Sequence, residues 1–266
     1  MGEPSRLTEV AAAGLAELAN GPPDRRRLEG ALRHLAKWRS AILQNTVVAK
    51  TGHLVQGGPF AGMDYGVPPA EGAGAARLLG AYEAGLHPVI ETIIARGYGQ
   101  IVDIGCAEGY YAVGLARRMP QARVLARDIS LRAQTLCATL AARNGVAARV
   151  EVGGILTHAD FARCAEVQTA VICDIEGAED DLLDPAAAPD LLRADILVEC
   201  HDGFRPGVTA RLAARFAATH RITRIDRVLA ADLLPDWAGA LSDLDRLLLL
   251  WEWRATPTPW LWMDRR

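Results

Sequence analysis

The chain has 266 residues, half of them hydrophobic and 23% charged, which is typical of a globular protein with one large domain or a domain plus a smaller addition. Its formal net charge of −3, with basic and acidic residues interleaved, gives no support for nucleic-acid binding. No apolar run approaches the roughly 20 residues that span a bilayer, and the first ten residues lack a signal-peptide core, so we expect a cytoplasmic protein without a membrane partner.

Residues 1–97 are expected to form an N-terminal helical cap with a β-prone connection. Residues 5–20 have an amphipathic helical pattern, and Asp24 is a suitable N-cap for a second helix to about residue 45. Between residues 46 and 69, short β-prone runs broken by glycine and proline predict a hairpin or an irregular connection. Helical spacing returns over residues 73–97. The sequence leaves open whether these helices form a lid over a ligand or a homodimer contact.

From residue 98 onward, short apolar runs alternate with helical stretches. Strands are expected at 100–104, 122–127, 148–152, 168–173 and 195–200, followed by RITRIDRV and a closing PWLWMDR. Helices are expected at 109–118, 130–144, 158–164, 178–193, 207–219 and 240–253. Strands that are apolar on both faces and joined by helical crossovers form a doubly wound, mostly parallel sheet. We therefore predict an α/β ligand-binding domain over residues 98–266.

The turn after the first of these strands, DIGCAEG at residues 103–109, carries the first ligand-binding signal. A glycine-rich turn between a buried strand and a helix lets a ligand approach the backbone. A dinucleotide-binding turn has a G-x-G-x-x-G pattern, but here Ala107 lies between Gly105 and Gly109. Glu108 would also place a negative charge beside a pyrophosphate. The turn therefore disfavours a nicotinamide dinucleotide and tolerates a ligand with an ammonium or sulfonium group.

Asp128 ends the second strand of this region, 23 residues after Gly105. An acid at this place accepts hydrogen bonds from the ribose hydroxyls of a bound nucleoside. The alternative role is a cap on the helix that follows, but Ser130 can provide that cap. We therefore expect Asp128 to be free to bind a ribose.

VDIGCAEG and ARDIS resemble the first and second motifs of the class I S-adenosylmethionine-dependent methyltransferases. The resemblance covers roughly residues 98–266 and implies a mostly parallel, seven-stranded Rossmann-like methyltransferase sheet with S-adenosyl-L-methionine as cofactor. It implies that four residues of the first motif surround the methionine part of that cofactor: Asp103, Gly105, Cys106 and Gly109. Asp128 would then hold the ribose, and Ile129 would lie against the adenine.

A narrower resemblance follows the fourth and fifth expected strands. CDIEGAEDDLLDP at 173–185 and ADILVECHDG at 194–203 look like segments of the FkbM-like branch, which is associated with O-methylation of secondary metabolites or sugars. The segment GPFAGMDYG…LLGAYEAGLHPVIE at 58–91 is similar to the approach to the cofactor site in related bacterial proteins.

Open α/β sheets bind ligands beyond the carboxyl ends of their strands, which here carry three candidate catalytic residues: Asp174, Glu176 and His201. His201 is the preferred general base, because a neutral imidazole accepts a proton near pH 7. Asp174 would contact the cofactor or hold the acceptor, and Glu176 would face the pocket or cap the next helix. With Glu199 and Asp202, these residues could form an oxygen-rich divalent-metal site, but no ligand spacing demands a metal and we expect none.

The sequence therefore predicts an S-adenosylmethionine-dependent methyltransferase whose partner is a small-molecule acceptor, with oxygen as the expected acceptor atom. Transfer to nitrogen or carbon and a non-catalytic, cofactor-binding module remain as alternatives. Nucleic-acid methylation would require a basic rim around the pocket, and the acidic strand ends argue against it. The four tryptophans of residues 251–262 fit a core or an interface better than a substrate platform.

Overall fold

The computed structural model describes residues 5–22, 24–70 and 72–266, and its centre is a seven-stranded sheet of order β3-β2-β1-β4-β5-β7-β6. The strands are β1 (Gln100–Ile104), β2 (Arg123–Arg127), β3 (Val150–Gly153), β4 (Thr169–Cys173), β5 (Asp195–Glu199), β6 (His220–Ile225) and β7 (Trp260–Arg265). β1 to β5 run parallel, whereas β7 lies antiparallel between β5 and β6. This is a seven-stranded, mostly parallel, doubly wound sheet of the Rossmann-like type, so the predicted fold class is confirmed.

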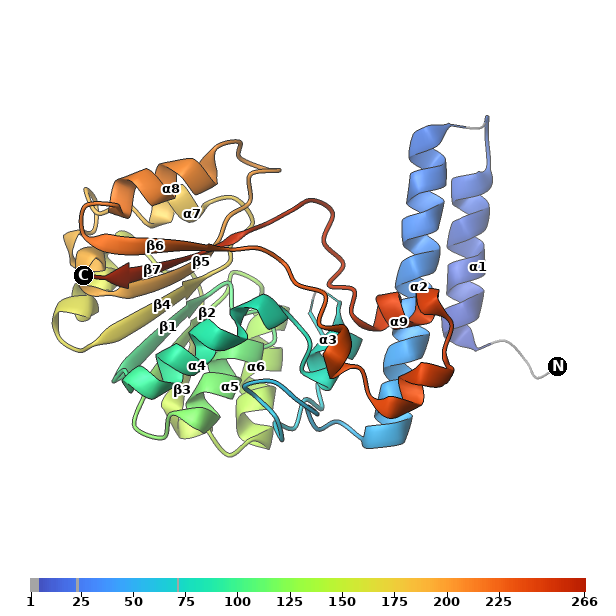
Figure 1. The fold of residues 1–266 in the computed structure, drawn as a ribbon, viewed down its shortest axis with the longest axis horizontal. Helices are drawn as coiled ribbons and strands as arrows, with labels where there is room; N and C mark the ends of the chain where they lie inside the picture. Colours follow the sequence, from blue (N-terminus) through green and yellow to red (C-terminus); the bar gives the residue numbers. More distant parts are fainter. Residues whose placement is uncertain (1–4, 23, 71) are drawn as a thin grey trace.

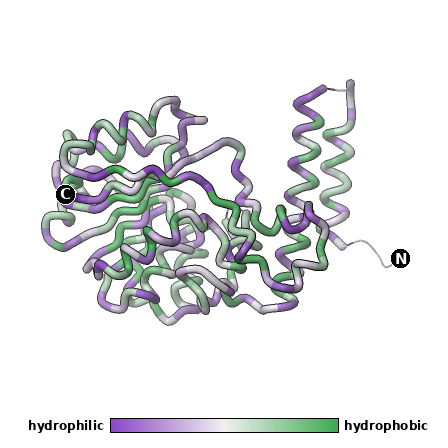
Figure 2. Tube along the Cα trace, viewed as in Figure 1, coloured by the Kyte–Doolittle hydropathy of each residue, from purple (hydrophilic) through white to green (hydrophobic). Residues whose placement is uncertain are grey.

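Helices cover both faces of the sheet (Figure 1). One face carries α4 (His87–Arg96), α5 (Tyr110–Arg118) and α6 (Leu131–Arg143), and the other carries α7 (Glu179–Leu182) and α8 (Val208–Phe216). Every residue of β1, β4 and β5 is buried, which explains why consecutive apolar residues, rather than alternating ones, form the centre of each strand. Figure 2 shows the hydrophobic residues running along the central strands. Apolar side chains before and after residue 97, where the sequence places the end of the cap, pack into one core cluster.

The N-terminal helices α1 (Arg6–Ala19) and α2 (Arg25–Thr51) form a hairpin that projects from the body of the molecule (Figure 1). The side chains of Ser5 and Asp24 cap them, as expected for Asp24. α2 continues six residues beyond its predicted end, so the β-prone TVVAKT is helical, because Leu43 and Val47 continue one buried stripe. No described helix, the 27-residue α2 included, is long and apolar enough to cross a membrane.

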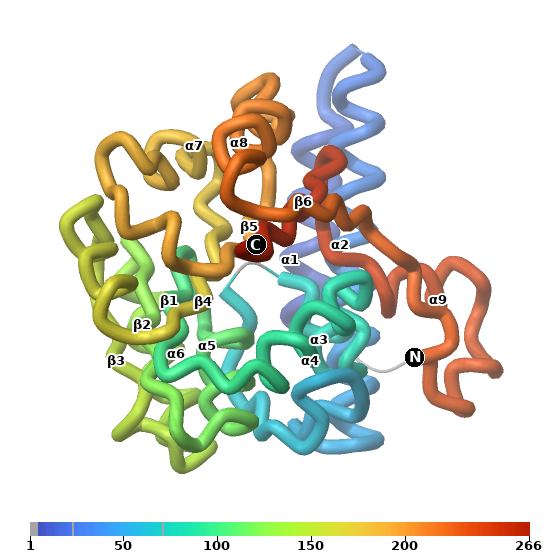
Figure 3. The backbone as a smooth tube through the Cα atoms, turned by 60° about the vertical axis from the view of Figure 1, so that its left-hand side comes forward, coloured from blue at the N-terminus to red at the C-terminus, as the bar shows by residue number. Residues whose placement is uncertain are grey.

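The predicted helix over 73–97 is wrong, because the chain forms α3 (Gly74–Leu79) and then turns before α4. Gly80 causes the turn: its φ is +73°, and a Cβ there would lie 2.0 Å from the carbonyl oxygen of Gly57. Between α2 and α3 the connection is irregular, with one antiparallel bridge joining Leu54 to Asp64. α3 packs beside α2 (Figure 3), whereas α4 covers the sheet next to α5 (Figure 1).

Two further predicted helices are shorter than expected. The stretch 178–193 contains only α7 and a 3-10 turn over Pro189–Arg193, because Pro185 and Pro189 interrupt the helical hydrogen bonds. The stretch 240–253 contains α9 (Asp243–Leu249), which packs beside α2 through a 2.6 Å ion pair between Asp245 and Arg39. Because α9 ends at Leu249, residues 250–258 are not helical, and they pass along the carboxyl ends of β4 and β5.

The strand order also predicts where a ligand binds. β1 lies between β2 and β4, so the connections from neighbouring strands leave in opposite directions at their carboxyl ends. Such a topological switch point opens a crevice in doubly wound sheets. The loops after β1, β2, β4 and β5 therefore define the region in which a functional site is expected.

Candidate functional site

The glycine turn after β1 lines a small cavity at the switch point. Gly105 and Gly109 have φ values of +79° and +94°, and a Cβ on Gly105 would lie 1.7 Å from the carbonyl oxygen of Asp174. Glycine is therefore required for the loop after β1 to pass this close to the loop after β4. The cavity is lined by Arg77, Tyr82, Asp103, Gly105, Cys106, Ala107, Glu108, Tyr110, Tyr111, Ile172, Asp174 and Trp260.

Asp103 provides a buried negative charge at this cavity. Its exposed fraction is 3%, and its Oδ2 atom has no hydrogen-bond partner among the described residues. Burial raises the pKa of this carboxyl to about 7. A buried carboxyl oxygen without a partner is costly, and a cationic donor such as the ammonium group of methionine would satisfy it. Asp103 therefore fits the place that the resemblance gives to the methionine part of the cofactor.

Asp128 is engaged by the backbone of two loops. Its Oδ2 accepts a hydrogen bond from the N–H of Ala107 at 3.0 Å, and its Oδ1 accepts one from the N–H of Ser130 at 2.8 Å. Ser130 caps α6 as expected, since its hydroxyl accepts from the N–H of Ala133. Ser130 thus provides the helix cap, and although Asp128 accepts from two backbone N–H groups, each of its carboxylate oxygens keeps a second lone pair that a ribose hydroxyl can use.

Two exposed apolar side chains follow the neighbouring ends of β2 and β3. Arg127 pairs with Gly153 in the sheet, and two positions beyond them lie Ile129 and Ile155, with exposed fractions of 82% and 75%. Apolar side chains at this place suit the flat surface of an adenine ring. Ile129 is expected from the sequence, whereas Ile155 is not, although the apolar pair after Gly154 is a signal for it. Together with Asp103 and Asp128, these residues fit S-adenosylmethionine.

Glu108 has a role that the sequence did not predict. It is fully buried, accepts hydrogen bonds from the Tyr65 hydroxyl and, at 2.8 Å, from the N–H of Ala70, and lies 3.2 Å from Nε of Arg77. Because Arg77 compensates its charge, the expectation that Glu108 repels a phosphate is wrong. The argument against a dinucleotide then rests on Ala107, which occupies the position of the central glycine in the G-x-G-x-x-G pattern. Glu108 instead connects the segment before β1 to the glycine turn.

A second cavity of about 420 Å³ lies beyond the ends of β4 and β5. It shares three wall residues with the first cavity: Arg77, Tyr82 and Asp174. Phe204 and Trp253 provide aromatic surface, and Phe204 is 69% exposed. The two cavities are therefore neighbours with Asp174 at their common boundary, an arrangement that suits transfer of a group from one ligand to another.

His201 lies beneath the second cavity within a cluster of carboxylates. Its Nδ1 atom donates to Glu179 at 2.5 Å, and its Nε2 atom lies 3.4 Å from Glu199, 3.6 Å from Asp174 and 3.8 Å from Glu176. Burial opposes the charged imidazolium, but the hydrogen bond to Glu179 and the surrounding carboxylates raise the pKa of His201 above its ordinary value. This differs from the neutral imidazole expected from the sequence, and it weakens the assignment of His201 as general base.

Asp174 has the properties expected of a general base. Its side chain keeps 27% of its exposed area, lines both cavities and forms no side-chain hydrogen bond with the described residues. Burial, together with the charge of Glu83, raises the pKa of Asp174 to about 7. Glu176 is 61% exposed at the cavity wall and does not cap α7, whose N-cap is Ala178. The three candidate residues thus lie together at the second cavity, and of the three Asp174 alone also lines the first cavity.

Three of the five candidate metal ligands converge. Asp174, Glu199 and His201 each offer an atom within 4.8 Å of the others. Asp202 is directed elsewhere, because its carboxylate accepts from the N–H of Gly207 at 2.9 Å and from the hydroxyl of Thr209. The donor set mixes carboxylate oxygens with an imidazole, which suits a transition metal better than magnesium.

We expect removal of metals with a chelator to leave the activity of this site unchanged. Glu199 is already paired with Arg254 and accepts a 2.6 Å hydrogen bond from Thr258, and the raised pKa of His201 favours its protonated form, which cannot bind a metal ion. The measurement compares initial rates before and after dialysis against EDTA. A loss of activity that magnesium or manganese restores would show instead that the cluster holds a catalytic metal.

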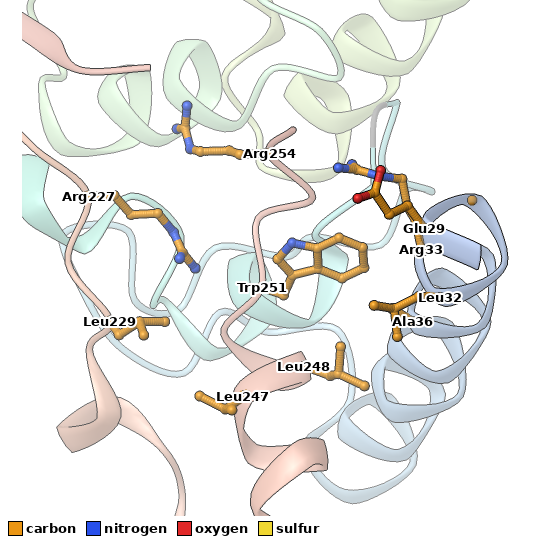
Figure 4. Close-up of a pocket in the computed structure, with 11 residues that line it drawn as sticks. Glu29, Leu32, Arg33, Ala36, Arg227, Leu229, Leu247, Leu248, Trp251 and Arg254 are labelled. Atoms are coloured by element: carbon orange, nitrogen blue, oxygen red, sulfur yellow. The ribbon is translucent and has the colours of Figure 1, made fainter. Parts of the chain in front are cut away.

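Arg254 connects three distant segments around the second cavity and was missed in the sequence. Its guanidinium pairs with Glu83 before α4, with Glu199 at the end of β5 and, at 2.9 Å, with Glu252. It also lines a groove of about 630 Å³ between α2 and α9, where Trp251 lies next to the leucines of α9 (Figure 4). A single arginine within the tryptophan-rich segment was the only signal for this role.

The tryptophans divide between two roles. Trp260 and Trp262 are buried in β7, as expected for core residues. Trp253 instead lines the second cavity, with a φ of +64° and its indole N–H donating to the Ser40 hydroxyl of α2 at 3.3 Å. The N-terminal hairpin therefore supports one wall of the cavity through Trp253.

Comparison with known proteins gives only distant similarities. No family model matches the chain, and no curated protein matches it. Similar solved structures include an O-methyltransferase from Bacillus cereus in complex with SAH, at 14% identity over 96% of this chain and 97% of that chain, with a TM-score of 0.47. They also include the O-methyltransferase TomG from Streptomyces achromogenes in complex with SAM, at 16% identity over 86% and 93%, with a TM-score of 0.43. The tRNA methyltransferase TrmK of B. subtilis is similar at 11% identity over 67% and 64%, with a TM-score of 0.44. Because these sequence identities and TM-scores are low, a function for this chain has to be inferred from its strand order and its site residues.

Proposed function

We propose that the chain is an S-adenosylmethionine-dependent methyltransferase that acts on a hydroxyl group of a small molecule. The observation that supports this most is the pair of cavities at the switch point, with Asp174 at their shared boundary. One cavity has the charges and loop geometry that suit the cofactor. The other has the size of a small-ligand site, with aromatic and carboxylate walls.

Residues of the first cavity and of the neighbouring ends of β2 and β3 would hold the cofactor as follows. Asp103 accepts from the ammonium group, the glycine turn gives the ligand access to the backbone, and Asp128 accepts from the ribose hydroxyls. Ile129 and Ile155 pack against the adenine. When bound, S-adenosylmethionine supplies a methyl group activated by the positive sulfur.

The second cavity would prepare the acceptor. Phe204 and Trp253 hold its apolar surface, and Asp174 accepts the proton of the hydroxyl whose oxygen takes the methyl group. His201 is held by its hydrogen bond to Glu179 and lies 3.6 Å from Asp174, so that the charge of its protonated form favours the ionised carboxylate of Asp174. Glu176, which is largely exposed, can pass the proton to solvent.

Charge favours a small molecule over a nucleic acid as acceptor. The carboxylates of Asp174 and Glu176 line the cavity, and a polyanionic backbone would meet them at close range. Arg254 and Arg77 also line the cavity, but each is paired with a buried glutamate. An uncharged acceptor with several hydroxyls, such as a sugar or a secondary metabolite, suits this combination.

The FkbM-like branch is part of the proposal and is supported by the two segments that carry the resemblance. The two segments are in contact, because Glu179 of the first accepts a hydrogen bond from His201 of the second. Within the first segment, Glu179 also accepts from the N–H of Gly177 at 3.0 Å. The acid and the histidine of these segments therefore belong to one buried hydrogen-bonded unit.

The proposal predicts that S-adenosylhomocysteine binds to the isolated protein and that NAD does not. Isothermal titration calorimetry measures both, and transfer of a labelled methyl group to a panel of small hydroxyl compounds measures activity. Binding of NAD in place of S-adenosylhomocysteine would overturn the assignment. Binding without transfer to oxygen, nitrogen or carbon acceptors would favour the non-catalytic module.

A further inference from the structure

We propose that Arg77 binds the carboxylate of the methionine part of the cofactor, so that the first cavity recognises an α-amino acid by two opposite charges. This inference rests on the proposed function and adds to it a binding residue from the segment before β1. Neither motif of the methyltransferase resemblance contains Arg77.

Arg77 is a buried cation placed at the cavity by α3. Its exposed fraction is 4%, and it lines both cavities. One Nη1 donor reaches the carbonyl of Gly72, and Nε lies 3.2 Å from the carboxylate of Glu108, whereas Nη2 makes no hydrogen bond in the described ranges. A guanidinium has five N–H donors in a planar fork, so donors remain for a carboxylate.

The position of the guanidinium is fixed before a ligand binds. Its carbon lies 4.1 Å from the centre of the Tyr82 ring, and Glu108 lies 3.2 Å from Nε. A cation held in this way loses little conformational freedom when it binds an anion. Because Glu108 offsets part of the charge, a single carboxylate fits this surrounding better than a doubly charged phosphate.

Asp103 completes the recognition within the same cavity. Its Oδ2 is buried without a hydrogen-bond partner in the described part of the chain. The cavity thus contains an unpartnered acceptor atom on Asp103 and, on Arg77, a guanidinium whose Nε faces Glu108 and whose Nη2 makes no hydrogen bond with the described residues. A zwitterion with one ammonium and one carboxylate group satisfies both residues at once.

The test compares two nucleosides that differ in the amino-acid end. S-adenosylhomocysteine contains it, and 5′-methylthioadenosine lacks it. For Arg77→Gln we expect the Kd of S-adenosylhomocysteine to rise about tenfold to a hundredfold, since one charge-assisted contact is lost, with the Kd of 5′-methylthioadenosine unchanged. Arg123→Gln is the matched control, because Arg123 is exposed at the opposite end of β2 and should change neither value.

The outcomes separate this inference from the proposed function. If the wild-type protein binds neither nucleoside, the proposed function fails. If Arg77→Gln binds S-adenosylhomocysteine as well as wild type, or loses both nucleosides equally, the assignment of Arg77 is overturned while the function stands. A raised acceptor KM with unchanged S-adenosylhomocysteine binding would assign Arg77 to the acceptor and also overturn it.

A measurement on the wild-type protein avoids any effect of the substitution on folding. The carboxamide of S-adenosylhomocysteine keeps the ammonium group and removes the negative charge. We expect it to bind about tenfold or more weakly than the parent compound. Equal binding of the two compounds would contradict a carboxylate contact with Arg77.

Discussion

Asp174→Asn is expected to lower kcat by about a hundredfold to ten-thousandfold, because an amide cannot accept the proton of the acceptor hydroxyl. The Kd of S-adenosylhomocysteine should remain unchanged, since the cofactor's charged groups are held elsewhere. The wild-type kcat should rise with pH up to about 7 and then level off: burial raises the pKa of Asp174 to about 7, and only the ionised carboxylate accepts a proton. The variant should lose this pH dependence.

Asp181→Asn is the matched control for this substitution. Asp181 is 70% exposed and is paired on the surface with Arg205, so its loss should leave kcat and its pH profile intact. His201→Gln distinguishes the two candidate bases. If Asp174→Asn keeps the wild-type rate and pH profile while His201→Gln loses them, the base is His201, as the sequence first predicted.

Asp128→Ala is expected to weaken the binding of S-adenosylhomocysteine by about a hundredfold to a thousandfold, because two charge-assisted hydrogen bonds to the ribose are lost. The free energy of unfolding should fall as well, since the carboxylate also accepts from the N–H groups of Ala107 and Ser130. Calorimetry measures the affinity, and urea denaturation measures the stability.

Ser130→Ala separates the two effects of Asp128. It removes the α6 cap and should cost about 1 kcal/mol of stability while leaving the affinity for S-adenosylhomocysteine unchanged. If Asp128→Ala lowers stability but binds the nucleoside as tightly as wild type, Asp128 only shapes the glycine turn and the ribose assignment falls.

Much of the fold could be predicted because parallel strands leave a simple pattern. β1, β4 and β5 are buried along their whole length, so each reads as a short apolar run between helical stretches. The positions of Asp103, Gly105 and Asp128 follow from the same pattern, because residues just after parallel strands gather at one edge of the sheet. The prediction that Asp174, Glu176 and His201 lie together rests on this rule.

What the sequence could not show depends on contacts between distant segments. Nothing local reveals that Gly80 must turn the chain, because the reason is the carbonyl of Gly57. The charge of Glu108 was misjudged, since its partner Arg77 lies 31 positions earlier. Arg254 and Glu83 are 171 positions apart, and neither belongs to a recognisable motif. Such pairs are formed by tertiary packing, and local patterns carry no information about them.

The position of β7 in the sheet has a consequence for how the chain folds while it is being synthesised. β7 is the last strand in sequence order, yet it fills the gap between β5 and β6. Until residues 260–265 leave the ribosome, the facing edges of β5 and β6 therefore expose unpaired backbone groups, which are prone to aggregation. Arg254 also emerges only then, so it meets Glu83 late. A nascent chain can thus assemble the glycine turn well before its acceptor cavity exists, and residues 252–265 complete the cavity and the sheet together.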